Sequence, residues 1–284
     1  MIICVLSGGL ANQLFQYAFA NSLKRNPDEL IFYEISTFSA KFLKKNTIRN
    51  LQLNKFVGIK LFKSTIFLWF IKVLVKSNIN LPCFTLISNN HVKKKMKKIL
   101  IVDAVFLDSE ILKFELHKNI NFYNTILSNK LKNDYVRMLN IDIENSCVIH
   151  VRRGDYVTNP EANKFHGVLN FDYYISAINL VKKQNPEILF YVITDDLNWS
   201  KNEFTPELGN FIFPEEEFNL SDIESLALIS RFKNQIIANS SFSLWAAYIS
   251  SYYFGSNESI KIYPKMWWNN SNNRMNFLNN WHCI

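Results

Sequence analysis

The sequence predicts an α/β protein with two units, each built around a parallel β-sheet. Short apolar runs typical of buried strands alternate with amphipathic stretches typical of helices. This alternation starts twice, near residue 1 and again near residue 146. The length of 284 residues also suits two domains of roughly 140 residues each better than one core. We therefore expect domains over residues 1–143 and 144–284.

The elements of the first half follow from its apolar pattern. IICVL reads as a buried strand, SGGLANQ as a glycine-containing turn, and LFQYAFANSLK as a helix with one apolar face. Two further strands are expected at 29–35 and 99–105, and helices at 60–76 and 124–139.

The second half repeats this scheme after a linker near 140–146. Strands are expected at 146–151, 188–194, 235–239 and 259–264. Helices are expected at 172–185, at 222–232 and through LWAAYIS. The C-terminal tail is expected to belong to the second domain. The alternative is that the tail packs against the first domain.

The charge is distributed unevenly between the two halves. Residues 1–140 hold 21 basic and 8 acidic side chains, a net charge of +13, whereas residues 141–284 hold 11 and 16, a net charge of −5. A basic half suits nucleic acid, an anionic membrane surface or an acidic glycan, or it is simply a solubilising lysine surface.

Neither a disulfide framework nor a metal site is expected. The four cysteines are scattered without a CxxC pair, and Cys4 and Cys147 lie in apolar runs, where a thiol packs as a small hydrophobe. This pattern favours a reducing cytoplasm. No Cys/His cluster has zinc-ligand spacing, and the sequence contains no DxD triplet.

The longest apolar stretch is IFLWFIKVLV at 66–75, which is too short to span a bilayer. The N-terminal MIICVL lacks the basic leader of a signal peptide. With KKKMKK at 93–98 nearby, the stretch either touches a membrane surface as an amphipathic element or forms a buried helix, and we favour the buried helix.

Four polar clusters fall where strands are expected to end: SGGLANQ, HVRRGDY, TDD and NSSFS. In open α/β sheets, ligands bind beyond these carboxyl ends. On a strand, His150 and Arg152 share a face, so both can meet one ligand. A guanidinium suits phosphate oxygens, and Arg153 either joins it or pairs with Asp155. The alternative is a purely structural Arg–Asp pair at the strand end.

The other clusters support the same hypothesis with their own alternatives. The serines of NSSFS either cap the following helix or, with its backbone N–H groups, form a seat for an anion. Asp195 and Asp196 either accept hydrogen bonds from a ribose or base, or cap a helix. SGGLANQ is neither GxGxxG nor a P-loop, but Asn12 and Gln13 suit sugar hydroxyls or phosphate. We predict a nucleotide diphosphate held by arginines and a helix N-terminus, without a metal.

Taken together, the motifs resemble those of the bacterial α-1,2-fucosyltransferases of glycosyltransferase family 11. The resemblance spans nearly the whole chain, and its blocks occur in the family's order: GGLANQLFQYAFA (8–20), IRNLQLNKF (48–56), HVRRGDY (150–156), HGVLNFDYY (166–174), TDDLNWSK (194–201) and NSSFSLWAAY (239–248). Ala11 departs from the usual glycine, and Leu244 from a common tryptophan.

The resemblance implies a GT-B-like fold, with two Rossmann-like domains facing a central cleft. It also implies inverting, metal-independent transfer of L-fucose from GDP-fucose to the 2-hydroxyl of a terminal β-galactoside in a bacterial surface glycan. GDP-fucose is then a substrate, and no cofactor is expected. The second domain binds this donor and the first serves the acceptor, at the inner face of the cytoplasmic membrane or free in the cytoplasm.

By the same resemblance, Arg152 binds the β-phosphate and Arg153 supports it. The other residues expected at the donor are His150, Asp195, Asp196, Asn239, Ser240, Ser241, Phe242, Asn12 and Gln13. Asp155, His166 and Glu34 remain open as general bases. Two rival interpretations are the same fold with another acceptor or linkage, and a basic nucleic-acid-binding protein, which leaves HVRRGDY without a role.

Overall fold

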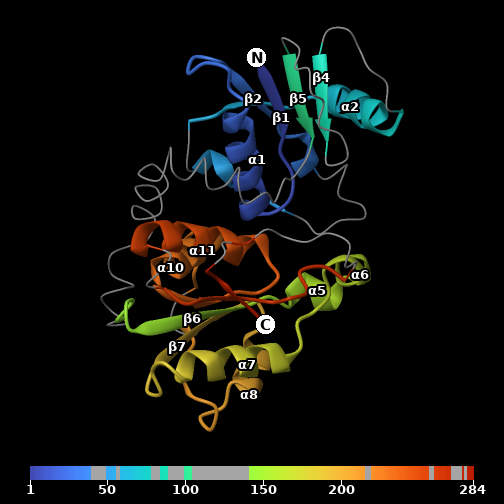
Figure 1. Cartoon of the computed structure of the whole chain (residues 1–284). Coiled ribbons are helices and arrows are strands. Elements are labelled where there is room, and N and C mark those ends of the chain that lie inside the picture. Colours follow the sequence, from blue (N-terminus) through green and yellow to red (C-terminus); the bar gives the residue numbers. More distant parts are fainter. Residues whose placement is uncertain are drawn as a thin grey trace. The chain divides into compact units, whose positions relative to one another are not determined.

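A computed structural model describes residues 1–39, 49–55, 58–77, 84–88, 99–103, 141–214, 219–255, 259–269, 277 and 280–284. The chain divides into two compact units, Met1–Glu115 and Leu116–Ile284, which we call the first and second units (Figure 1). The helix predicted at 124–139 lies within 104–140, outside the described residues. That helix, the predicted domain boundary at 143/144 and a cleft between the units all stay predictions.

The first unit is built on a five-stranded sheet in the order β3-β2-β1-β5-β4. Every pairing among its described strands is parallel, which confirms the predicted α/β class for this unit. Its strands are β1 (Ile2–Val5), β2 (Ile31–Glu34), β3 (Lys60–Phe62), β4 (Phe84–Ser88) and β5 (Ile99–Asp103). Its helices are α1 (Leu10–Ser22), α2 (Thr65–Ser77) and the short 3-10 turns Ser36–Phe38 and Leu53–Lys55.

The helix predicted over 60–76 is wrong at its start. Residues Lys60–Phe62 pair with β2 as an edge strand, and α2 begins only at Thr65. The sequence pattern also does not predict strand β4. Both strands contain polar residues, Lys60 in β3 and Thr85 and Ser88 in β4, so neither forms a continuous apolar run.

Helix α2 covers one face of this sheet. Its inward side chains Ile71 and Leu74 pack against Ile101 of β5, with Ile3 and Leu86 around them. Figure 1 shows α2 beside β4 and β5. Among the described residues, no helix has the length and apolar character required to traverse a membrane.

The second unit holds a six-stranded sheet in the order β11-β10-β9-β6-β7-β8, and its described pairings are all parallel. Its strands are β6 (Ser146–Val151), β7 (Leu189–Thr194), β8 (Asn210–Ile212), β9 (Asn234–Ile236), β10 (Lys261–Tyr263) and β11 (His282–Cys283). Its helices are α5 (Gly154–Thr158), α6 (Pro160–His166), α7 (Phe171–Lys182), α8 (Leu197–Glu203), α10 (Asp222–Arg231) and α11 (Ser241–Phe254). Figure 1 shows α7 and α8 on one face of the sheet and α10 and α11 on the other.

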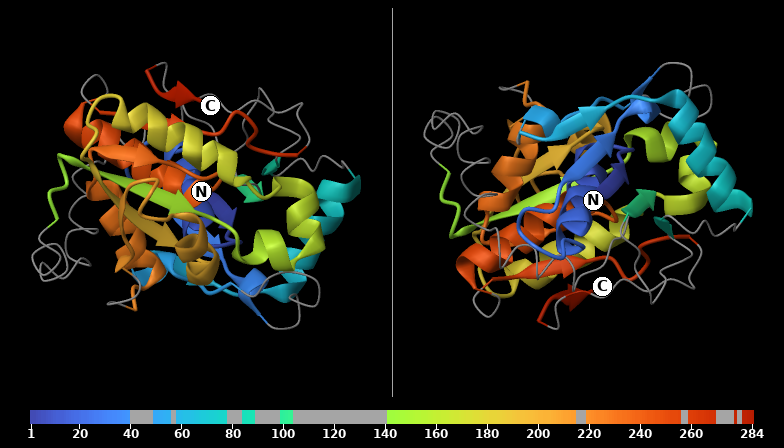
Figure 2. Two further views of the ribbon diagram at one scale, coloured as in Figure 1. Left: turned by 90° about the horizontal axis from the view of Figure 1, so that it is seen from below. Right: turned by 90° about the horizontal axis from the view of Figure 1, so that it is seen from above.

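All four strands predicted in this half are present, although β9 and β10 are shorter than expected. The short elements α5, α6, α8, β8 and β11 have no counterpart in the sequence prediction. The strand β11, red beside the label C in Figure 2, adds to the edge of the sheet by pairing with β10. The C-terminal residues thus belong to the second sheet, and packing on the first unit stays a prediction.

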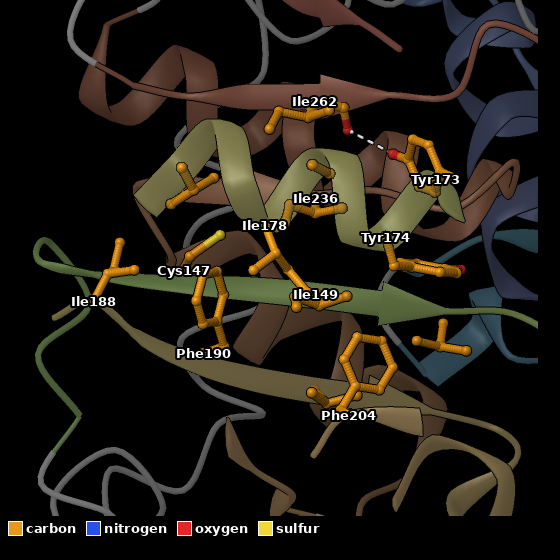
Figure 3. Packing of buried hydrophobic residues seen from close by; sticks show 14 residues of the cluster. Cys147, Ile149, Tyr173, Tyr174, Ile178, Ile188, Phe190, Phe204, Ile236 and Ile262 are labelled. Atoms are coloured by element: carbon orange, nitrogen blue, oxygen red, sulfur yellow. Dashed lines mark hydrogen bonds between the residues drawn. The ribbon is translucent and has the colours of Figure 1, made fainter. Parts of the chain in front are cut away.

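The core of the second unit lies between α7 and the central strands β6 and β7. Ile149, Phe190 and Ile178 meet there without solvent exposure (Figure 3). The hydroxyl of Tyr173 donates to the carbonyl oxygens of Ile237 at 2.6 Å and Ile262 at 3.2 Å. The polar atom of this buried phenol is therefore satisfied by one carbonyl just after β9 and one within β10.

The free thiols behave largely as predicted. Cys4 and Cys147 are buried and unpaired, and burial raises the pKa of each thiol far above its usual value. Cys283 is exposed and also free. The described cysteines thus act as packing residues or surface thiols, with no disulfide among them.

A lysine side chain, Lys261 on β10, lies fully buried in the second unit. Its ammonium donates to the carbonyl oxygen of Lys233 and, at 2.8 Å, to the hydroxyl oxygen of Ser250. Burial lowers the pKa of Lys261 to about 7, the nearby Cys147 opposes this shift, and the charge of Lys233 adds to it. The folded protein therefore favours the neutral amine.

We expect this lysine to make the stability of the protein depend on pH. Between pH about 7 and 10.5 the unfolded chain holds a proton on this lysine that the folded chain has lost. The free energy of unfolding should therefore rise with pH across this window. Lys261→Met should abolish that part of the slope in urea titrations, whereas Lys265→Met, at an exposed lysine, should keep it. Equal slopes in wild type and Lys261→Met would contradict the assignment.

Candidate active site

The order of the second sheet creates a switch point between β6 and β9. From β6 the chain proceeds to β7 on one side, and from β9 to β10 on the other, while β6 and β9 are neighbours. Loops that diverge in this way leave a crevice beyond the carboxyl ends of the strands. HVRRGDY and NSSFS follow these two strands. The sheet thus brings together two clusters that are almost ninety residues apart.

The guanidinium of Arg152 lies between two carboxylates. Its Nη1 is 2.6 Å from Oδ2 of Asp195, and its Nη2 pairs with Asp155. The guanidinium also lies over the ring of Tyr156, 5.4 Å from its centroid. The side chain retains 22% exposure. Arg152 is therefore fixed in direction by its neighbours while still reaching the surface.

Arg153 is held by a second carboxylate and an indole. Its Nε donates to Oδ2 of Asp196 at 3.0 Å, and its guanidinium lies 4.0 Å from the ring centroid of Trp199. These contacts use one edge and one face of the guanidinium. Its Nη groups make no hydrogen bond to other described residues. They are the donors best suited to an incoming anion.

Two guanidinium groups face three carboxylates, so this cluster has no excess positive charge from its side chains. Backbone donors offset part of the negative charge. Oδ1 of Asp195 accepts from the backbone nitrogens of Arg153 at 2.7 Å and Gly154 at 3.1 Å, and Asp196 caps α8 by accepting from Trp199 N. The ion pair considered between Arg153 and Asp155 is formed differently, because Asp155 pairs with Arg152 and Arg153 pairs with Asp196. Asp196 also caps a helix, as its structural alternative predicts. Ligand binding by these residues stays a prediction.

His150 lies at the end of β6 with only 7% exposure. Its ring is 5.6 Å from that of Phe242, at the start of α11. Burial, aided by the charge of Arg152, lowers the pKa of His150 to about 3, so the ring is neutral at neutral pH. Its Nδ1 is buried without a hydrogen-bond partner in the described structure.

A second aromatic pair connects α5 with α6. The rings of Tyr156 and His166 stack at 4.5 Å and 7°. Burial lowers the pKa of His166 below its usual value, with Asp155 opposing and Arg152 adding to the shift. The Tyr156 hydroxyl donates to the carbonyl oxygen of Asn239 at 3.3 Å. His166 is thus neutral at neutral pH and able to accept a proton.

NSSFS occupies the turn from β9 into α11. The amide of Asn239 donates to the carbonyl oxygens of His166 at 2.9 Å and Gly167 at 3.3 Å, so it fixes the end of α6. Ser240 is the N-cap of α11 and accepts from Phe242 N. Ser241 is the first residue of the helix. The N-terminal end of this buried helix, with its partial positive charge, thus lies at the switch point.

Asn12, Gln13 and Glu34 belong to the first unit. Gln13 is fully buried: its amide nitrogen donates to Gly8 O and Asn50 O, and its oxygen accepts from Gln52 N and Leu53 N. The oxygen Oε1 of Glu34 accepts from the backbone nitrogens of Ser36 and Ser64.

These contacts of Gln13 and Glu34 organise loops of the first unit. Gly8 shows why that turn needs glycine, with φ of +76° and Asn12 directly against it. The structure thus brings the second-unit candidates together and leaves the donor-binding role of the first-unit candidates a prediction.

Three residues of the site are not singled out by the sequence pattern. Tyr156 lies against the guanidinium of Arg152, and Trp199 lies against that of Arg153. Gly154 has no side chain, which leaves room for the carboxylate of Asp195. Tyr156 lies four residues after Arg152 and three after Arg153, and Trp199 lies four residues after Asp195. An aromatic residue three or four positions from a charged one is the sequence signal that could have identified them.

The described residues contain no group of three or more His, Cys, Asp or Glu side chains arranged to hold a metal ion. Asp155, Asp195 and Asp196 are directed toward guanidinium groups instead. Metal independence of the reaction stays a prediction.

The two parallel α/β units and the arginine-containing switch point are features of enzymes that bind nucleotide-linked substrates. A family model described as glycosyl transferase family 11 matches residues 1–284, and the chain belongs to this family. This confirms the resemblance seen in the motifs and makes the protein a glycosyltransferase by family.

Two curated relatives are similar over most of the chain. The chain is 28% identical to the O-antigen biosynthesis glycosyltransferase WbnK of Escherichia coli, over 97% of this chain and 98% of that protein. It is 31% identical to an alpha-1,2-colitosyltransferase of Escherichia coli, over 94% and 92%. The galactoside 2-alpha-L-fucosyltransferase Sec1 of Mus musculus is 30% identical over 36% of this chain and 28% of that protein.

A solved structure of a mutant of Arabidopsis thaliana FUT1 in complex with GDP overlaps 88% of this chain and 68% of that chain. The TM-score is 0.48 and the identity 11%. Overlap at this level supports no inference about the ligands of the present protein.

We expect Gly154→Ala to destabilise the second unit. A Cβ atom at this position would lie 2.6 Å from Oδ2 of Asp195 and would displace the carboxylate from its backbone donors. The free energy of unfolding should fall by about 1–3 kcal/mol in urea titration. Gly58→Ala, where no atom lies within 4 Å of the added carbon, is the matched control. Equal stability of the two variants would show that the contact is unimportant.

Proposed function

We propose that the protein transfers L-fucose from GDP-fucose to the 2-hydroxyl of a terminal β-galactoside in a bacterial surface glycan. The anomeric carbon is inverted and an α-1,2 linkage is formed. The family membership and the name of the Sec1 relative support a fucosyl donor and a galactoside acceptor. The name of the WbnK relative supports an O-antigen glycan as the product.

The observation that supports donor binding best is the pair of arginines beside the N-terminus of α11 at the switch point. In the proposed reaction the oxygen of the acceptor 2-hydroxyl attacks the anomeric carbon, and the bond from this carbon to the β-phosphate oxygen breaks. GDP leaves with the electron pair, and the hydroxyl proton passes to a base or to water. Negative charge grows on the departing phosphate, where guanidinium donors stabilise it.

In this proposal the ion pairs of the site are exchanged on donor binding. The N–H groups of Arg152 that pair with Asp155 are proposed to bind the β-phosphate instead, while Asp195 keeps the guanidinium in place. Arg153, supported by Trp199, offers its Nη groups to the same diphosphate. His150 and Phe242 then serve the guanine or ribose, and Ser240, Ser241 and Asn239 border the phosphates. Asn12 and Gln13 are proposed to contact the donor from the first unit.

The general base has three candidates with different surroundings. Asp155 is paired with Arg152, which suits a counter-ion better than a base. His166 is neutral at neutral pH and stacked on Tyr156 beside the arginines, so it is the base that we propose. Glu34 is fully buried, and its Oε1 accepts from backbone nitrogens. No cofactor or metal has a role in this proposal, and nucleic acid is not among its partners.

A second candidate keeps the reaction and changes the donor sugar. The relative named as an alpha-1,2-colitosyltransferase is similar over 94% of the chain, whereas the named fucosyltransferase Sec1 is similar over 36%. Colitose is L-fucose without its 3-hydroxyl group. A nucleotide-linked colitose would use the same diphosphate site and differ only where the sugar is bound.

The proposal is tested by incubating the protein with GDP-fucose and a terminal β-galactoside in the presence of EDTA. We expect GDP release together with a product fucosylated at the 2-hydroxyl, because guanidinium groups stabilise the leaving group. A parallel reaction with GDP-colitose gives a second value of kcat/KM, and the larger of the two values identifies the preferred donor. Abolition of GDP release by EDTA would contradict the metal-free mechanism, and transfer to another hydroxyl would contradict the linkage.

Arg152→Lys tests the role of the guanidinium. A lysine keeps the charge but cannot hold Asp195 and phosphate oxygens at once, so kcat should fall by about 10²–10³-fold. Arg25→Lys, at an arginine paired with Glu29 in the first unit, is the control and should keep full turnover. Circular dichroism and thermal melting should show that both variants are folded. Turnover retained by folded Arg152→Lys would refute the assigned role.

A further inference from the structure

We propose that α2 binds the first unit to the surface of an anionic lipid bilayer. The inference concerns a surface to which the proposed transfer reaction assigns no role, and its test needs no sugar nucleotide. It rests on the exposure of apolar side chains along one side of the helix and on the charge around them.

An apolar stripe runs along the outer side of α2. Ile66, Trp69, Phe70 and Val73 have relative exposures of 80%, 64%, 38% and 41%. Their spacing of three, one and three residues places them within an arc of about 100° of the helix surface. These four apolar side chains, which include the two bulky aromatic groups of Trp69 and Phe70, thus face solvent on one side.

The opposite side of the same helix is already buried. Leu68, Ile71 and Leu74 have at most 5% exposure, and Ile71 and Leu74 pack on the sheet of the first unit. Packing against the protein's own core therefore does not account for the apolar stripe. A helix that is apolar on both sides is typical of one that contacts a second apolar medium.

The charge around the stripe favours an anionic surface. From residue 60 to residue 76 the sequence has four lysines and no acidic residue. Lys60, Lys63 and Lys76 are exposed, and Lys76, seven residues after Trp69, lies on the same side of the helix about two turns further on. Lys72 is different, because its ammonium pairs with Asp103 at 2.8 Å. Lys76 on this side of α2, with Lys60 and Lys63 just before the helix in the chain, gives the segment positive charge. This charge can meet lipid phosphates while the apolar side chains enter the bilayer.

The dimensions fit a helix that lies in the plane of the interface. Thirteen residues give a length of about 20 Å, which is too short to span the hydrocarbon layer. Trp69 projects from the middle of the stripe, and indole side chains favour the headgroup region. The arrangement matches a peripheral amphipathic helix with basic residues next to its apolar face.

A second copy of the chain fits the same surface less well. In a two-fold symmetric dimer each residue faces the equivalent patch, so the lysines of one copy would approach the lysines of the other. No acidic residue within 60–76 would relieve this repulsion. We therefore favour lipid as the occupant and treat self-association as a competing outcome of the test.

The experiment measures co-sedimentation of the full chain with phosphatidylcholine vesicles, with and without about 30% phosphatidylglycerol. We expect binding to the anionic vesicles to exceed binding to the neutral ones at least about tenfold, and to weaken in roughly 0.5 M salt. The double variant Ile66→Ser/Trp69→Ser should lose at least about tenfold in bound fraction at limiting lipid. Tyr253→Ser, at a residue of α11 with 61% exposure, is the control and should bind like wild type.

Thermal melting of both variants shows whether they are folded, and sedimentation velocity without lipid shows whether they self-associate. If the double variant is folded and binds anionic vesicles as wild type does, the proposal fails. It also fails if wild type binds neither kind of vesicle, or if wild type forms a dimer that the double variant loses. Binding that is equal on neutral and anionic vesicles refutes the role of the lysines.

Discussion

The carboxylate of Asp195 is the group on which the geometry of the second-unit site depends. It pairs with the guanidinium of Arg152 and accepts hydrogen bonds from the backbone nitrogens of Arg153 and Gly154. One side chain at the end of β7 thereby fixes the loop that follows β6. A substrate anion would meet an arginine whose direction is already set, so less conformational entropy is lost when it binds.

Most of the second-unit fold is predictable because its central strands are long apolar runs. β6 is buried along its entire length, and a strand buried on both faces appears in the sequence as a recognisable apolar run. The edge strands β8 and β11 have three and two residues, too few for a pattern to show. The start of α2 escapes prediction for a related reason, since the apolar stretch continues from β3 into the helix across only two residues.

The candidate site is predictable as a set of positions but not as a set of contacts. The rule that polar residues follow parallel strands places Arg152, Asp195 and Ser240 at one edge of the sheet. It does not reveal that Asn239 fixes the end of α6, or that Gln13 is a buried clamp, because an amide suits a ligand and a backbone carbonyl equally well. Which hydrogen-bond partner each side chain has in the fold depends on distances in three dimensions, and the spacing of residues along the chain does not give these distances.

The buried amine of Lys261 has a consequence for how the second sheet assembles. β10 has three residues and pairs with only a few positions of β9, so apolar contacts alone would allow it to slide. A shift by one residue would turn the lysine to the other face and leave its amine without the Lys233 carbonyl and the Ser250 hydroxyl. A methionine there would tolerate such misalignment. The lysine thus sacrifices some stability for a unique alignment of a weak strand.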